Sequence, residues 1–516
     1  MGAADRPNIV IVVMDCVRAQ NLPVYGYDRP TAPRIAELAA EGLRYDNAIV
    51  AGDQTLSSTT SLFTGVRPST HQLRISGERL DPGWHTLAEA MQHSGYATYS
   101  VNCSNTHLSS YGGLDRGFDH YVQLASPLRG RWGRVKKGPV GDEADEELPN
   151  PAVEPSEAAE AGGAVETNSR WRSKLADDLH WLMTRLVDKG AARAFERTRS
   201  ILRRSTPGQP AFVYVHLMET HSRYLPPLGH WGLFLPDCRG RKGWRINHNG
   251  FPFTSGSVKM DNLDFEIVTS LYDGAIHYTD ALFGRFFERL RNDGQLDNTV
   301  IVLTADHGDN LGEHGMLGHS LCVYDTIVRV PLLVWGPVVE RRARGSVIAD
   351  LVQNIDLPTS CLEWAGVRED PILQQTEGDA LPLAPGASSG REYAVSEASY
   401  VFHPSQADKL KEQDLFYLGS IGLRTEQHKL IWNTDGFEEF YDLAADPGEV
   451  DNLLELNDPE ADCVDGELAR LRSALGPLRL VFERVHNETL MRLEHGGSAD
   501  PDPAVAERLR DLGYIK

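Results

Sequence analysis

Four uninterrupted apolar runs, rich in Val, Ile and Leu, constrain the fold of this chain more than any other feature. Each run is short enough for a strand, and none has the alternating polar face of a strand that is half exposed. Such runs are typical of parallel strands that helices cover on both sides. The runs are NIVIVVM (8–14), AFVYVHLM (211–218), TVIVLTA (299–305) and VPLLVWG (330–336).

Helical patterns lie between these runs. TAPRIAELAAEGL (31–43), HTLAEAMQHSGY (85–96) and the segment 264–292 each place apolar residues on one helical face. Gly42 and Gly95 stand where helix C-terminal glycines belong. Alternation of strands with helices predicts an α/β fold, a three-layer sandwich in which helices flank a large, mostly parallel sheet.

Two other regions depart from this alternation. QHKLIW (427–432) and EEFYDL (438–443) alternate like half-buried strands around the turn NTDG (433–436), and a helical pattern closes the chain. We therefore expect a catalytic domain over 1–400 and a smaller antiparallel lobe over 401–516. The segment 138–169 holds nine acidic residues and no basic ones, which predicts a disordered insertion, followed by a helical stretch at 170–204.

Composition excludes several classes of protein. The 516 residues carry a net charge of −22, which argues against nucleic-acid binding, and no run reaches the length of a membrane span. The six cysteines form no close pair, so neither a disulfide scaffold nor a zinc motif is predicted. Because a basic lead-in and a cleavage site are missing around 8–14, we expect a first strand rather than a signal peptide, and a cytoplasmic protein.

Acidic residues and histidines follow three of the predicted strands. Asp15 ends the first strand, Glu219 and His221 follow the second, and Asp306 with His307 ends the third. Ligands of open α/β sheets bind beyond the carboxyl ends of the strands. A lone Asp after a strand is usually a turn residue, but three such ends together predict a divalent-cation site of hard oxygen ligands with one imidazole.

The segment DQTLSSTTSLFTG (53–65) is rich in Ser and Thr before a plausible helix. Taken alone, it is typical of a helix cap. Beside a cation, however, one hydroxyl at a helix N-terminus becomes a candidate nucleophile, because the cation lowers its pKa and the helix amides receive an anion.

Several motifs together resemble the sulfatase family of the alkaline phosphatase superfamily. The resemblance covers nearly the whole chain except about 125–205 and 370–395, and it implies that superfamily's fold and ester hydrolysis. The motifs that carry it are PNIVIVVMDCVRAQNLPVYGYDRP (7–30), TLSSTTSLFTG (55–65), HLMETHSRYLPP (216–227), LTADHGDNLGEHGMLGH (303–319), RVPLLVWGP (329–337) and FYDLAADPGEVDNL (440–453).

Position by position, the resemblance implies roles for eight residues. One divalent metal would be bound by Asp15, Asp306, His307 and the hydroxyl of Thr55, which would also be the nucleophile. Contacts with the substrate anion or its leaving group would come from His107, His221 and His319, with Asn105 in the place of a family lysine.

Two departures from the family pattern bear on the chemistry. Thr55 stands where sulfatases convert Cys or Ser into formylglycine, and threonine would give a ketone rather than that aldehyde. Cys16 replaces the second metal acid, and a thiol is a poor ligand for Ca²⁺ or Mg²⁺. A metal-bound threonine resembles the arrangement in superfamily members that cleave phosphoesters with one metal. This resemblance favours Mn²⁺ as the bound ion, and Ca²⁺, Mg²⁺ and Zn²⁺ are the other candidates.

The sequence therefore predicts a metal-dependent hydrolase or transferase that cleaves a phosphate ester, a diester or a monoester, by in-line attack of Thr55. Two alternatives are a sulfuric ester hydrolase that works without formylglycine and a non-catalytic binding protein of the same fold. The substrate would be a small or a lipid- or glycan-linked anionic ester. Tyr224, Trp231 and Trp244 are candidates for an apolar wall beside it, although packing in the core explains them equally well.

Overall fold

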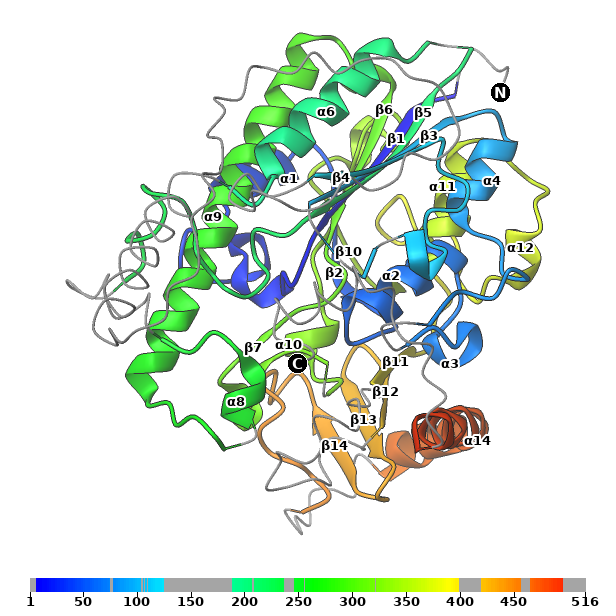
Figure 1. Ribbon diagram of the computed structural model, residues 1–516. Helices are drawn as coiled ribbons and strands as arrows, with labels where there is room; N and C mark the ends of the chain where they lie inside the picture. The colour runs from blue at the N-terminus through cyan, green and yellow to red at the C-terminus, as the bar shows by residue number, and fades with distance from the viewer. Residues whose placement is uncertain are drawn as a thin grey trace, which may run out of the picture.

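A large eight-stranded sheet forms the centre of the molecule (Figure 1). The computed structural model describes residues 6–74, 78–103, 105, 107–108, 110–124, 188–206, 208–235, 246–254, 256–320, 322–398, 419–455 and 465–494. In spatial order the strands are β10 (Val347–Gln353), β2 (Leu43–Ile49), β9 (Leu332–Trp335), β6 (Thr299–Thr304), β1 (Asn8–Met14), β5 (Ala211–Leu217), β3 (Ala97–Cys103) and β4 (His120–Leu124).

The sheet is mostly parallel, as predicted. Strand β1 pairs in parallel with β5 on one side and β6 on the other, so Val12 lies opposite both Val215 and Leu303. Strand β9 alone among the described strands of this sheet runs antiparallel to its neighbours, β2 and β6. All four apolar runs are thus strands, and the central position of β1 places its end between two other strand ends.

Helices cover both faces of the sheet, which confirms the three-layer sandwich. Side chains of β1 alternate between the two faces, and both sets are fully buried. Val10, Val12 and Met14 pack in the core that includes helices α1 (Pro33–Ala39), α6 (Ala191–Arg204) and α9 (Asn262–Asn292). Ile9, Ile11 and Val13 face the opposite core, with helices α2 (Thr55–Thr64), α4 (Leu87–His93) and α11 (Asp356–Trp364).

The predicted helices are present, two of them shorter at both ends and the third two residues longer at its start. Pattern 31–43 forms α1, pattern 85–96 forms α4, and pattern 264–292 forms α9. Capping boxes set two of the starts, Thr86 with Glu89 for α4 and Asp261 with Asp264 for α9. Of the predicted stretch 170–204, the structure describes the part that forms α6, whereas the acidic segment 138–169 lies outside the described residues.

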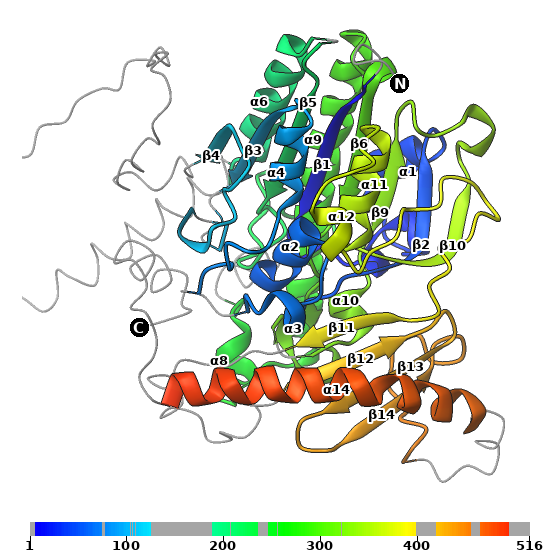
Figure 2. The ribbon, with the colours of Figure 1, turned by 90° about the vertical axis from the view of Figure 1, so that its right-hand side faces the viewer.

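A second, antiparallel sheet is present, as the fold class predicted (Figure 2). Its first strand, at 394–398, precedes residue 401, where the smaller lobe was expected to begin. Its strands lie in the order β11 (Ala394–Ala398), β12 (Ser420–Arg424), β13 (His428–Asn433) and β14 (Glu438–Asp442). Helix α14 (Asp465–Glu494) packs Leu468, Leu471, Leu475 and Phe482 against this sheet. None of the helices that the structure describes is both long and apolar enough to cross a membrane.

Strand β11 ties the small sheet to the loop before α2. The backbone N–H of Glu397 donates to the carbonyl of Ala51 at 2.9 Å, and the hydroxyl of Ser396 donates to the carbonyl of Val50 at 2.6 Å. The Glu397 carboxylate also accepts hydrogen bonds from the backbone and hydroxyl of Ser69. Short elements complete the fold: α3 (Pro68–His71), α8 (Gly250–Thr254), β7 (Asn310–Leu311), β8 (Leu317–Gly318), α10 (Asp325–Val328) and α12 (Ile372–Gln375).

Candidate active site

Three adjacent strands bring buried polar side chains to one edge of the sheet. Asp15 directly follows β1, and its backbone N–H continues the ladder by donating to the carbonyl of Leu217 at 3.0 Å. Asp306 and His307 follow β6, which lies on the other side of β1. The ligand atoms of Asp15, Asp306 and His307 lie within 4.8 Å of one another. The structure therefore confirms that the ends of β1 and β6 bring these side chains together.

The carboxylate of Asp306 has one satisfied oxygen and one unsatisfied oxygen. Its Oδ1 accepts hydrogen bonds from the backbone N–H groups of Cys16 at 3.2 Å and His307 at 3.0 Å. Its buried Oδ2 accepts none from the described residues, although Nε2 of His307 lies 3.5 Å away and Nε2 of His216 lies 3.9 Å away. A buried carboxylate oxygen without a donor is costly unless a cation compensates it. This donor set therefore fits a divalent cation.

Thr55 is the first residue of α2, and its hydroxyl oxygen lies 3.2 Å from Nε2 of His307. The other ring nitrogen of His307, Nδ1, lies 2.8 Å from the carbonyl of Gly308, which fixes the ring. Close packing of the loop before α2 requires Gly52, because a Cβ there would lie 2.4 Å from Oγ of Ser57. Loop and strand end together aim the hydroxyl of Thr55 at the cluster.

Two further histidines join this cluster from separate loops. His319 lies with its ring centre 4.3 Å from that of His307, and the ring centre of His221 lies 5.4 Å from that of His319. Each ring is held through Nδ1, by the Ser222 carbonyl at 2.7 Å for His221 and by Oδ1 of Asp309 at 3.1 Å for His319. Metal-binding and catalytic histidines are commonly oriented in this way through their second nitrogen.

Asn105 and His107 approach the cluster from the segment after β3. The amide nitrogen of Asn105 donates to Oδ2 of Asp15 at 3.1 Å, and its Oδ1 accepts from the backbone N–H of His107 at 2.9 Å. Asn105 thus contacts a proposed metal ligand directly. Burial, together with the neighbouring His221 ring, lowers the pKa of His107 to about 4. All eight residues that the sequence assigned to the site therefore lie in or around one buried cluster.

Charges within the cluster oppose the effect of burial. Burial alone would raise the pKa of Asp15, but the neighbouring imidazoles, His221 first, hold it well below its usual range. Burial alone would lower the pKa of His307, but the Asp306 and Asp15 carboxylates raise it above its ordinary value. Burial lowers the pKa of His221. Asp15 is therefore ionised at neutral pH, as a metal ligand must be.

The structure adds three residues that the sequence reasoning did not assign to the site. His216 in β5 lies with Nε2 at 2.8 Å from Oδ2 of Asp15, and the Tyr214 hydroxyl lies 3.0 Å from its Nδ1. A histidine inside an apolar strand was the available signal for it. Asp53, two residues before Thr55, is buried, and burial raises its pKa to about 7. Cys16, which replaces a metal acid, donates its thiol hydrogen to Oδ1 of Asp15 at 2.9 Å.

Several other expected residues have structural roles. Glu219 accepts hydrogen bonds from the backbone N–H groups of Lys189 and Ala191 at the start of α6, and so it caps that helix instead of joining the cluster. Tyr224 and Trp231 are buried in the core around α9, where the Tyr224 hydroxyl donates to Asp309. Trp244 lies outside the described residues.

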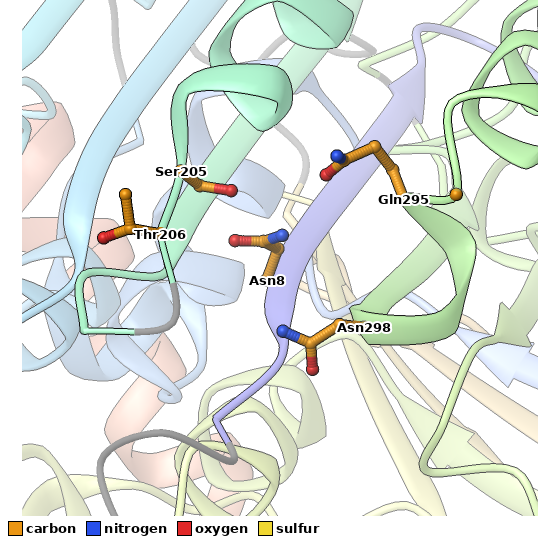
Figure 3. Close-up of a pocket in the computed structure, with 6 residues that line it drawn as sticks. Asn8, Ser205, Thr206, Gln295 and Asn298 are labelled. Carbon is orange, nitrogen blue, oxygen red and sulfur yellow. The ribbon is translucent and has the colours of Figure 1, made fainter.

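A separate pocket of about 180 Å³ lies at the amino end of β1, away from the cluster (Figure 3). Amide and hydroxyl side chains line it, and none of its lining residues titrates near neutral pH. They are Asn8, Ser205, Thr206, Gly294, Gln295 and Asn298. This pocket can donate and accept hydrogen bonds, but it offers neither a nucleophile paired with a base nor a set of metal ligands.

The fold and the buried carboxylate–imidazole cluster define an ester-bond hydrolase of the alkaline phosphatase superfamily. The chain belongs to the sulfatase family: the Sulfatase family model matches residues 7–367. A second model, for the C-terminal region of N-sulphoglucosamine sulphohydrolase, matches residues 312–474. These matches confirm the resemblance found in the sequence. Proteins of this fold family generally bind a divalent metal, in agreement with the ligand cluster.

Relatives and solved structures extend the match over most of the chain. An arylsulfatase of Clostridium perfringens is 24% identical over 490 residues, which cover 87% of this chain and 90% of the relative. The phosphonate monoester hydrolase of Agrobacterium radiobacter superposes with a TM-score of 0.65 at 18% identity, covering 93% of this chain and 96% of that one. The structure of BT4656 in complex with its substrate, D-glucosamine-2-N,6-O-disulfate, superposes with a TM-score of 0.63 at 20% identity. The match covers 96% of this chain and 99% of that one.

Proposed function

We propose that this sulfatase-family hydrolase cleaves a phosphate ester, a diester or a monoester, by in-line attack of the Thr55 hydroxyl. The observation that carries the proposal is the position of that hydroxyl, 3.2 Å from Nε2 of His307 beside the buried Asp15 and Asp306 carboxylates. A hydroxyl nucleophile at the start of a helix, next to a cation site, is a recurring arrangement for transfer at an anionic centre.

Asp15, Asp306 and His307 would hold the divalent cation, with the Thr55 hydroxyl within reach, and we propose Mn²⁺ as that ion. When bound, the cation supplies positive charge that stabilises the equatorial oxygens and lowers the pKa of the attacking hydroxyl. The first turn of α2 points its backbone N–H groups toward the same place. Negative charge that develops during attack is therefore met by groups that are already in position.

The remaining histidines of the cluster complete the reaction. Asp309 holds Nδ1 of His319 at 3.1 Å, so the protonated ring can give the proton on Nε2 to the departing oxygen. His221 and His107 contact the non-bridging oxygens. The Thr55 hydroxyl loses its proton to solvent as Oγ1 forms the bond to phosphorus, and the bond to the leaving oxygen breaks as that oxygen takes the proton of His319. Water, or an acceptor alcohol, then gives a proton back to His319 as it displaces the threonine oxygen, which regains its own proton from solvent.

Threonine chemistry favours phosphorus over sulfur at this site. The methyl group on Cβ of Thr55 prevents formation of the aldehyde on which formylglycine sulfatases depend. A solved neighbour of the same fold is, by its name, a phosphonate monoester hydrolase, which supports a fold able to accept a phosphorus centre. The second candidate is hydrolysis of a sulfuric ester without formylglycine, which the match to the sulfatase model and the arylsulfatase relative favours.

The test is turnover of four matched aryl substrates by the purified protein loaded with Mn²⁺: a phosphodiester, a phosphomonoester, a phosphonate monoester and a sulfate. We expect Thr55-dependent cleavage of a phosphate ester to exceed that of the sulfate. Faster Thr55-dependent turnover of the sulfate would replace the proposal with the second candidate. Metal binding without turnover of any of the four would favour a non-catalytic member of the family.

A further inference from the structure

The donors around Asp15 divide into two overlapping groups. One group is Asp15, Asp306 and His307, which the proposed function uses. The other is Asp15, Cys16 and His221, whose ligand atoms also lie within 4.8 Å of one another, with all three residues buried. Asp15 belongs to both groups and has two carboxylate oxygens. Two neighbouring cation positions that share one bridging carboxylate are therefore compatible with this arrangement.

The backbone of Cys16 is held in a conformation that directs its sulfur into the second group. Its φ is 63°, in the left-handed region that residues other than glycine seldom adopt. The backbone N–H of Cys16 is fixed by Oδ1 of Asp306 at 3.2 Å, and its carbonyl accepts from the Tyr272 hydroxyl at 2.7 Å. The sulfur then lies 2.9 Å from Oδ1 of Asp15 and 3.6 Å from Nδ1 of His319. Uncommon backbone held by such contacts is frequent at functional sites.

His221 is oriented for ligation in the same way. Its Nδ1 lies 2.7 Å from the carbonyl of Ser222, and this bond turns the Nε2 side of the ring away from that carbonyl. A ring that donates one N–H to a backbone carbonyl presents the other nitrogen as a ligand. One thiolate, one imidazole and one carboxylate, with a fourth position open, is the type of set that binds catalytic Zn²⁺ and other borderline cations, and not Ca²⁺ or Mg²⁺.

We infer that Asp15, Cys16 and His221 form a second cation site that selects Zn²⁺ or a similar borderline ion through the Cys16 sulfur. Binding releases the thiol proton to solvent and forms a bond from the thiolate to the ion. The inference rests on the proposed function in placing this ion beside the same substrate anion, and His221 would then act on that anion through the ion, because Nε2 of the ring binds the cation. It assigns a use to the residue that replaces a metal acid of the family.

Cobalt(II) tests this site, because a thiolate ligand gives Co²⁺ an intense near-ultraviolet charge-transfer band that oxygen and nitrogen ligands do not give. Chelator-treated full-length protein is titrated with Co²⁺, and bound metal is counted by mass spectrometry. We expect the band in the wild type, its bleaching by one equivalent of Zn²⁺, and its persistence in excess Ca²⁺. Cobalt bound without the band, or a band that Ca²⁺ removes as readily as Zn²⁺, would overturn the inference.

Variants assign the band to Cys16. Cys16→Ser should lose the band and one equivalent of metal, whereas Cys361→Ser, a buried cysteine in α11, should keep both. Cys16→Asp retains an anionic donor, so it should lose the band but keep the metal count. Asp306→Asn should keep the band and lose the other equivalent. A band that survives Cys16→Ser would refute the assignment. Thr55→Ala should keep the band, so failure of the phosphoester chemistry is distinguishable from failure of this site.

Discussion

The hydroxyl oxygen of Thr55 and Nε2 of His307 lie 3.2 Å apart, although 252 positions separate them in the chain. The contact joins the first turn of α2 to the carboxyl end of β6, and so it depends on both the loop before the helix and the sheet. Because His307 is itself fixed at Nδ1 by the Gly308 carbonyl, the direction of the threonine hydroxyl is set by backbone rather than by mobile side chains.

Replacing Thr55 with alanine should abolish turnover while leaving the cation bound. We expect kcat/KM for the best phosphate ester to fall by at least roughly a thousandfold, because the nucleophile is lost. Ser57→Ala is the matched control: it removes a hydroxyl from the same helical turn, one that donates only within the helix to the Gln54 carbonyl. Steady-state kinetics and metal content are measured together. More than a tenth of the activity in Thr55→Ala would contradict the mechanism.

His216 should act as a positioning residue for the cation site. Its Nε2 lies 2.8 Å from Oδ2 of Asp15, so His216→Ala should weaken Mn²⁺ binding by about 10- to 100-fold. Tyr214→Phe, which removes only the hydroxyl beside Nδ1, should weaken binding less. Titration calorimetry with Mn²⁺ checks both, with exposed His93→Ala as the control. Equal affinities in wild type and His216→Ala would exclude this role.

Stability should depend on pH through Asp280. This buried carboxylate accepts hydrogen bonds from the backbone N–H groups of Arg34 and Ile35 in α1, yet burial raises its pKa from 3.8 to about 6. Between these two values the folded state keeps a proton that the unfolded chain has lost. The free energy of unfolding therefore falls as the pH rises through this window, by on the order of 3 kcal/mol from this group.

Asp280→Asn isolates that contribution. The amide does not titrate, so the difference in unfolding free energy between variant and wild type should shift in favour of the variant between pH 4 and pH 7. Urea unfolding at several pH values measures the difference. A difference that does not change with pH would show that the carboxylate titrates alike in the folded and unfolded chain.

Lys429 should stabilise the contact between the smaller sheet and helix α10. Its buried ammonium lies 2.9 Å from Asp325 and 2.7 Å from Glu449, so Lys429→Met would leave buried carboxylates without this partner. We expect a loss of about 3–5 kcal/mol in the free energy of unfolding. Arg472→Met removes an exposed ion pair with Glu438 in the same lobe and should cost less than about 1 kcal/mol. Similar costs for the two variants would refute the claim.

The sequence predicted the strands that are buried on both faces of the sheet. It did not predict strands, or strand directions, that depend on pairing with neighbouring strands. Short apolar runs such as 8–14 favour buried strands, whereas β2 and β10 carry polar residues and were not identified. The antiparallel direction of β9 depends on its pairing with β2 and β6, and the residues of β9 alone do not indicate that direction. Meeting of the strand ends at Asp15 and Asp306 followed from the topology of a parallel sheet.

Side-chain direction explains what the sequence did not predict about the site. Glu219 and His216 both lie near the end of β5, but His216 points toward Asp15 while Glu219 turns to the start of α6. The direction of each side chain depends on which helix packs beside the strand end, and the local sequence pattern does not show this. Likewise, Cys16 is a departure from the family pattern in sequence, and the neighbours of its sulfur are defined only by the fold.

Strand β11 pairs with the loop that leads into α2, and this pairing has a consequence for the order of events on the ribosome. Every proposed ligand, the threonine nucleophile and the histidines have been synthesised by residue 319, whereas β11 begins at Ala394. The hydrogen bonds from Ser396 and Glu397 to Val50 and Ala51 form only after that. A nascent chain therefore carries all the proposed reactive groups before the strand that fixes the loop leading to the threonine, which is made in the last quarter of translation.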